Sequence, residues 1–342
     1  MTGCNKSRVA VILISGLILL AQLLLSNSSI VSAHPWQSSP RERARPDKQS
    51  EADAGPAPVI WQEPSDLESR DFFHGIGGKK GAPDPSDQFR LIRRDTSGHA
   101  EKIQVEDSRG RRWTVKFGEE SRPETVASRI VWAVGYHTDQ DYFVEQVNIE
   151  GRGRVRDVRF ERDDDGFKKI DRWDWNNNPF LETRELDGLK VLMAFLNNFD
   201  LKTDNNKIVR PSGKRPGDPE IHIYYVNDLG ATLGATGKWF GGIPLFGELP
   251  AGTKGSAEDF ARQALVDRVQ NGVVTFRMKR TRAQRAITGV KVENARWIGN
   301  LLGRLSDKQL WDAFRAGGFS KETIEVYVRA LRARIIQLQR LE

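Results

Sequence analysis

Hydrophobic positions in the first half of the chain alternate with polar ones over short stretches. Turn-forming residues at 95–98 and 107–110 separate the first of these stretches. This pattern is typical of β-strands joined by tight turns, so we predict an antiparallel meander with further strands after it. The predicted strands are 89–93, 102–106, 112–117, 142–149 and 154–160.

Between the third and fourth of these strands, apolar residues recur at helical spacing. The apolar stripe consists of Val126, Ala127, Ile130, Val131 and Val134. Ser121 is expected to cap this helix, with Pro123 at the first helical position, where its missing N–H costs no hydrogen bond. The sequence therefore predicts one helix within the sheet-forming half.

Helical spacing dominates the second half. Helices are predicted at 186–196, 257–269, 293–302, 307–314 and 321–338, and a strand at 221–226. Ser306 and Gln309 have the spacing of a capping box. No internal repeat is visible.

The first 33 residues have the pattern of a signal peptide. Lys6 and Arg8 precede an apolar run at 9–25, and Val31-Ser32-Ala33 supplies small residues for cleavage after Ala33. We predict an exported protein, periplasmic or secreted. The alternative is an uncleaved membrane anchor at 9–25, with the rest facing out of the cytoplasm. Amino-terminal sequencing of envelope-fraction protein decides: a chain starting at His34 supports cleavage, and one starting at Met1 or Thr2 favours the anchor.

Composition narrows the class of protein. With 38% hydrophobic and 29% charged residues among 342, the chain is neither a polytopic membrane protein nor wholly disordered. Residues 34–57 hold almost no large aliphatic side chains, which predicts a disordered spacer. The net charge is +7, but the basic residues are interleaved with acidic ones, so nucleic acid is not the favoured partner. The one cysteine, Cys4, lies in the predicted signal peptide, so the mature chain has no disulfide.

Some conspicuous residues have structural explanations. The glycine cluster at 75–78 fits a turn better than a phosphate-binding loop. Trp173 and Trp175 fit packing at a junction better than stacking on a sugar or a base. The histidines show no metal-binding spacing, and no Gly-x-Ser-x-Gly motif is present.

A polar segment after the helix at 186–196 carries the most informative motif. It contains Asp200-Leu201-Lys202 with Asn205, and Asp228-Leu229-Gly230 follows the strand at 221–226. These residues resemble the protein-kinase-like superfamily. There, a catalytic Asp is followed by Leu-Lys and, five residues after the Asp, by an Asn, and a metal-binding Asp opens Asp-Phe-Gly. Leu229 stands in place of the Phe.

The upstream segment follows the same order. Residues 113–116, Trp-Thr-Val-Lys, resemble the kinase Val-Ala-Ile-Lys strand, whose lysine holds phosphates and pairs with a helix glutamate. Glu124 is the candidate partner of Lys116. On the predicted helix it shares a face with Ala127 and Val131, so its carboxylate should point inward.

The resemblance implies a fold. We expect an α+β, two-lobed protein-kinase-like architecture, with a small antiparallel sheet lobe at 58–172 and a helical lobe at 173–342. A signal peptide at 1–33 and a disordered spacer at 34–57 would precede them.

The resemblance also implies roles, with ATP and Mg²⁺ as cofactors. Lys116 and Glu124 would bind the nucleotide. Asp200 would orient or deprotonate the acceptor hydroxyl, and Lys202 would neutralise the moving phosphate. Asn205 and Asp228 would hold magnesium, a hard cation that prefers oxygen ligands.

The chain departs from signalling kinases at several points. Asn198-Phe199 replaces the His-Arg before the catalytic Asp, and no Gly-x-Gly-x-x-Gly lies between the first two strands. Residues 206–220 form a long insertion between the two motifs. The chain is therefore more similar to atypical HipA-type, lipid and spore-coat-type kinases.

The sequence leaves three functions open. The first is an exported, magnesium-dependent, ATP-using phosphotransferase whose acceptor is a protein hydroxyl, lipid, sugar or metabolite. The second is a silent kinase-like module that binds a nucleotide or an envelope partner. The third is an envelope scaffold in which residues 200–206 form only a polar turn. A calcium loop of EF-hand type starting at Asp200 fits less well, because Lys202 and Pro211 would occupy ligand positions.

Overall fold

The structure is a computed structural model, and it describes residues 55–95, 101–163, 166–213, 218–236, 252–278 and 281–342. The chain divides into units 1–53 and 54–342. The predicted signal peptide and nearly all of the predicted spacer lie outside the described residues. Among those described, no helix combines the length and apolar character needed to cross a membrane.

Five strands form a closed barrel in the order β2-β3-β4-β6-β5. They are β2 (Phe89–Asp95), β3 (Lys102–Glu106), β4 (Arg112–Lys116), β5 (Asp141–Glu150) and β6 (Gly153–Arg162). All five were predicted within two residues at each end. The closure, by parallel pairing of Phe89 with Ile149 on β2 and β5, was not predicted.

The barrel has its own hydrophobic core. Side chains alternate across each strand, so every second residue points inward. Ile103 and Val105 of β3 meet Trp113 and Val115 of β4 and Phe160 of β6 there. Residues of opposite parity, among them Lys116, therefore lie on the outer face.

Helix α2 (Ser121–Ala133) packs on that outer face, against β5 and β6. Its apolar stripe, which includes Val126, Ile130 and Val131, belongs to a second and larger core. The predicted start of this helix was wrong. Glu120 is the N-cap, and the Ser121 hydroxyl donates to the Lys116 carbonyl at 3.3 Å.

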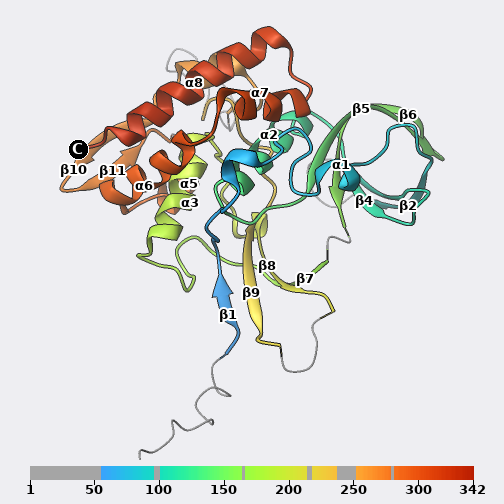
Figure 1. The fold of residues 1–342 in the computed structure, drawn as a ribbon, viewed down its shortest axis with the longest axis horizontal. Coiled ribbons are helices and arrows are strands. Elements are labelled where there is room, and N and C mark those ends of the chain that lie inside the picture. Colours follow the sequence, from blue (N-terminus) through green and yellow to red (C-terminus); the bar gives the residue numbers. More distant parts are fainter. Residues whose placement is uncertain (1–54, 96–100, 164–165, 214–217, 237–251, 279–280) are drawn as a thin grey trace, which may run out of the picture. The chain divides into compact units, whose positions relative to one another are not determined.

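A second sheet has the strand order β1-β9-β8-β7, and its first strand precedes the barrel strands in the chain (Figure 1). Its strands are β1 (Ala57–Val59), β7 (Phe167–Asp171), β8 (Asn206–Pro211) and β9 (Ile221–Val226). Strand β9 was predicted correctly. Strand β8 occupies the start of the segment predicted as an insertion, and Ala57, the last residue of the predicted spacer, already belongs to β1.

Helices build the larger core. They are α3 (Arg184–Phe195), α6 (Val292–Gly303), α7 (Asp307–Ala316) and α8 (Lys321–Gln339), and the short elements are η1 (Leu67–Ser69), α1 (Gly78–Gly81), η2 (Thr203–Asn205), α4 (Ala257–Arg262) and α5 (Thr281–Ala286). The predicted capping box of Ser306 and Gln309 is confirmed. Trp173 and Trp175 are buried, with ring centroids 4.9 Å apart, so they pack as predicted.

One predicted helix is wrong. Residues 257–269 form α4 and then strand β10 (Val266–Gln270), which pairs in a small sheet with β11 (Val273–Phe276) and β12 (Val290–Lys291). The apolar residues Leu265 and Val269 fit a helical stripe in the sequence. Pairing of Val269 with Val274 instead satisfies the backbone in a strand.

A buried arginine of α8 fixes the segment that leads into the candidate catalytic loop. Arg334 donates to the carbonyl oxygens of Phe195, Phe260 and Gln263 at 2.6, 3.0 and 2.9 Å, and to Asn197 Oδ1 at 3.1 Å. We expect Arg334→Met to lower the free energy of unfolding by about 3 kcal/mol, because buried acceptors lose their donor. Urea unfolding measures this. The same substitution at exposed Arg329 of α8 should change little, and equal losses at both positions would contradict the role given to Arg334.

Candidate active site

Lys116 is the centre of the candidate site. It ends β4, where Trp113 and Val115 face the barrel core and Lys116 faces the opposite side. Its side chain is 2% exposed. A buried ammonium requires charged or hydrogen-bonding partners, and three carboxylates surround this one.

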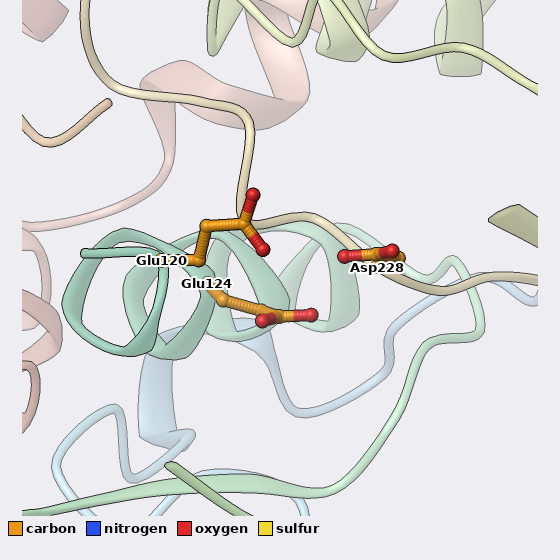
Figure 2. A group of neighbouring side chains, drawn as sticks. All are labelled: Glu120, Glu124 and Asp228. Atoms are coloured by element: carbon orange, nitrogen blue, oxygen red, sulfur yellow. The ribbon is translucent and has the colours of Figure 1, made fainter. Parts of the chain in front are cut away.

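Helix α2 and its N-cap residue supply two of the three carboxylates. Glu124 Oε2 lies 3.2 Å from Lys116 Nζ, as the converging faces predicted. Glu120, one turn earlier, places Oε2 2.5 Å from the same nitrogen. Its Oε1 lies 2.6 Å from Lys254 Nζ. Figure 2 shows both glutamates on the helix, beside the loop that carries Asp228.

Asp228 supplies the third carboxylate, two residues after β9. Its Oδ1 accepts a hydrogen bond from Lys116 Nζ at 2.7 Å. Its φ of 53° lies in the left-handed region, which Asp tolerates better than most residues. Gly230 packs so closely on Glu120 that a Cβ at position 230 would lie 2.6 Å from the Glu120 Cβ. A glycine there therefore allows Glu120 to reach Lys116.

Asp200, Lys202 and Asn205 form a second group in one loop. Lys202 Nζ donates to Asp200 Oδ2 at 2.6 Å. Asn205 Nδ2 donates to the Asp200 carbonyl at 2.7 Å and to its Oδ2 at 3.3 Å. Asp200 is partly exposed, so its carboxylate is open to a bound acceptor.

Backbone hydrogen bonds hold the two groups side by side. The Asn227 amide donates to the Asn205 carbonyl at 3.0 Å, and the Phe199 amide to the Ala231 carbonyl at 3.2 Å. The bond from Asn227 places the residue before Asp228 directly against Asn205. All six predicted site residues thus lie in two neighbouring clusters. Within the described residues, no side-chain hydrogen bond or ion pair joins one cluster to the other.

The electrostatics of the cluster favour the charged forms of Lys116 and Asp228. Burial lowers the pKa of Lys116, but the charges of Glu124, Asp228 and Glu120 outweigh burial and raise that pKa above its ordinary value. For Asp228, burial acts to raise the pKa, and contact with Lys116 lowers it below the usual range. Burial raises the pKa of Glu124, opposed by the charges of Arg159 and Lys116. Lys116 and Asp228 are therefore ionised at neutral pH.

A groove of about 530 Å³ opens beside the Asp200 loop. It is lined by Asp174, Trp175, Asn176, Leu201, Lys202, Thr203, Asp204, Arg285 and Ala286. The groove has polar walls next to the candidate base and offers a place for an acceptor molecule.

Three residues of the site were not predicted. Glu120 lies four residues before Glu124, so its position on the same helix face was a usable signal. Arg159 and Lys254 carry no such signal, because charged residues in a strand or loop are most often exposed. Their roles depend on contacts with residues distant in sequence.

No protein-family model matches the chain, and no curated protein matches it. The solved structures that are similar to it in fold include two kinases. The Helicobacter pylori proinflammatory kinase CtkA has 13% identity and a TM-score of 0.45, over 75% of this chain and 97% of that chain. The Rio2 kinase from Chaetomium thermophilum, as an ADP/Mg²⁺–phosphoaspartate complex, has 13% identity and a TM-score of 0.29, over 72% of each chain.

Proposed function

We propose that the chain is an exported, magnesium-dependent, ATP-using phosphotransferase of kinase-like fold. The observation that carries the proposal is the meeting of Lys116, Glu124 and Asp228. A strand, a helix and a loop deliver them, and the lysine and the aspartate are 112 positions apart. In kinases, a strand lysine that binds phosphates pairs with a helix glutamate, and a loop aspartate beside them holds magnesium.

The donor chemistry of the site fits magnesium. Carboxylate oxygens of Glu120, Glu124 and Asp228 lie within 4.8 Å of one another. Asn205 donates through Nδ2, and no described residue donates a hydrogen bond to its Oδ1, so this oxygen is available to an ion. Asp228 and Asn205 would therefore hold the ion through oxygen. A phosphate chain would add negative charge beside three carboxylates, so its binding requires a divalent cation.

The Asp200 loop suits transfer to a hydroxyl. When bound, ATP supplies the phosphoryl group and magnesium offsets its charge. The acceptor oxygen forms a bond to the γ-phosphorus while the bond from that phosphorus to the bridging oxygen of ADP breaks. Asp200 takes the hydroxyl proton, and Lys202, 2.6 Å from Asp200, offsets charge on the moving group.

Calorimetry tests the proposal. The full-length chain is titrated with ATP in the presence of Mg²⁺ and again with excess EDTA. We expect saturable binding only with the ion. Turnover is then followed as ³²P transfer from γ-labelled ATP to water or to the chain itself. Absence of binding with any divalent ion contradicts the proposal. Binding without turnover favours the silent module.

Substitution of Glu120 should strengthen Mg·ATP binding, whereas most substitutions in a binding site weaken it. It occupies a third partner position on Lys116, where phosphate oxygens would otherwise bind. Glu120→Gln keeps the shape but removes the charge, so we expect Mg·ATP to bind about tenfold tighter, a change of about 1.4 kcal/mol. The control is Glu119→Gln at the exposed neighbour, 3.4 Å from Lys254, which should leave affinity unchanged. Weaker binding of Glu120→Gln would instead place Glu120 among the metal ligands.

A further inference from the structure

Arg159 is a buried cation that the proposed function has not used. It lies on β6 with a side chain 3% exposed. In the register between β4 and β6 it is directly opposite Lys116. Two cations facing each other across a strand pair repel, so such a pair requires anions between them.

Glu124 lies between the two cations and uses both of its oxygens. Oε2 accepts a hydrogen bond from Lys116 Nζ at 3.2 Å, whereas Oε1 forms an ion pair with Arg159 Nη1 at 3.1 Å and accepts no hydrogen bond from a described residue. The carboxylate is therefore held from two sides and cannot rotate without losing one contact. The Glu124 side chain is 1% exposed, so water does not replace either partner.

Other carboxylates hold the guanidinium in turn. Arg159 Nη1 donates to Asp141 Oδ1 at 2.5 Å, and Nη2 donates to Glu161 Oε2 at 2.8 Å. Asp141 begins β5, and Glu161 lies on β6 itself. Arg159 is thus anchored to the barrel independently of Glu124 and can act as a fixed support for it.

We propose that Arg159 is a positioning residue of the phosphate-binding site: it holds Glu124 by Oε1 so that Oε2 remains on Lys116 when a nucleotide binds. Without Arg159, Lys116 is the one remaining partner of the Glu124 carboxylate among the described residues, and the phosphates would also engage Lys116. This inference rests on the proposed function.

A double-mutant cycle on the full-length chain tests the inference. Mg·ATP affinity is measured for Arg159→Met in the wild-type and Glu124→Gln backgrounds. We expect about tenfold weaker binding in the first background and no more than about twofold in the second, because the arginine acts through Glu124. Arg159→Lys, which keeps one cation near Oε1, should recover part of the loss. The control is Arg156→Met, at an exposed arginine of β6, and it should change nothing.

Two results would overturn the inference. The first is an equal loss of affinity in both backgrounds, which makes Arg159 a structural residue only. The second is full affinity in folded Arg159→Met. If Arg159→Met does not fold, the same cycle with Arg159→Lys decides, with a smaller loss expected only where Glu124 is present.

If the proposed function is wrong, the wild-type chain binds no nucleotide, and this result differs from both results that would overturn the inference on Arg159. The support of Glu124 by Arg159 is then measured without nucleotide. In wild type, Lys116→Met and Glu124→Gln should shift the urea midpoint non-additively. That non-additivity should shrink in Arg159→Lys. If it does not, Arg159 does not hold the pair.

Discussion

Asp228→Asn should abolish magnesium-dependent nucleotide binding while leaving the fold intact. The substitution removes the charge that would hold the ion and that now pairs with Lys116 at 2.7 Å. Loss of residues that only support a metal ligand costs 10- to 100-fold in affinity, so loss of the ligand's charge should cost about a hundredfold or more. Calorimetry with Mg·ATP measures the change.

The fold should survive Asp228→Asn, because Asn fits the same backbone conformation and keeps an acceptor oxygen. Asn adopts the left-handed φ of 53° at position 228 as readily as Asp does, and its side-chain oxygen still accepts from Lys116. Asp204→Asn, at an exposed aspartate paired with Arg172, provides the matched control. Wild-type affinity in Asp228→Asn would remove that residue from the metal site. If Asp228→Asn lowered the melting temperature, the loss of affinity would reflect loss of folded protein and would not assign Asp228 to the metal site.

Asp200→Asn should separate binding from chemistry. Lys116, Glu124 and Asp228 belong to the other cluster, and Asn205 keeps its 2.7 Å hydrogen bond to the carbonyl of residue 200, so Mg·ATP affinity should stay within about twofold of wild type. Transfer of the γ-phosphoryl group should fall about a hundredfold or more, because removal of a general base has effects of this size. The measurement is ³²P transfer at saturating ATP, beside calorimetry on the same preparation.

Asp307→Asn, at an exposed aspartate of α7 that does not line the groove, serves as the control. Unchanged transfer in Asp200→Asn would show that another group takes the proton. A parallel loss of affinity would show that the two loops act as one unit, as their shared backbone hydrogen bonds would allow.

Local patterns of apolar and polar residues predicted the barrel strands and the pairing of Lys116 with Glu124. Alternation along 102–106 and 112–116 reports which face of a strand is buried, and the stripe of α2 reports which face of the helix is. Together they predicted that Lys116 and Glu124 would meet, which the 3.2 Å contact confirms. The roles given to Asp200, Lys202, Asn205 and Asp228 remain predictions, because geometry does not measure catalysis.

The features that escaped prediction depend on partners far along the chain. Barrel closure joins Phe89 to Ile149, and nothing near either residue indicates the other. The sequence does not indicate strand β8 within the predicted insertion at 206–220, because β8 pairs with β9 only after the intervening loop folds back. Arg159 resembles the exposed arginines around it, and only the approach of Glu124 distinguishes it.

Closure of the barrel also limits which changes the sequence can accept. In an open sheet, an inserted residue shifts one strand and leaves the others in place. In a closed ring, each strand is bonded on both sides, so a shift in one must be matched around the whole circuit. A one-residue deletion inside β4 would turn Lys116 into the apolar interior and bring Val115 under α2. Length variation among natural relatives of this chain should therefore be confined to the connections between barrel strands, and the strands themselves should keep constant length.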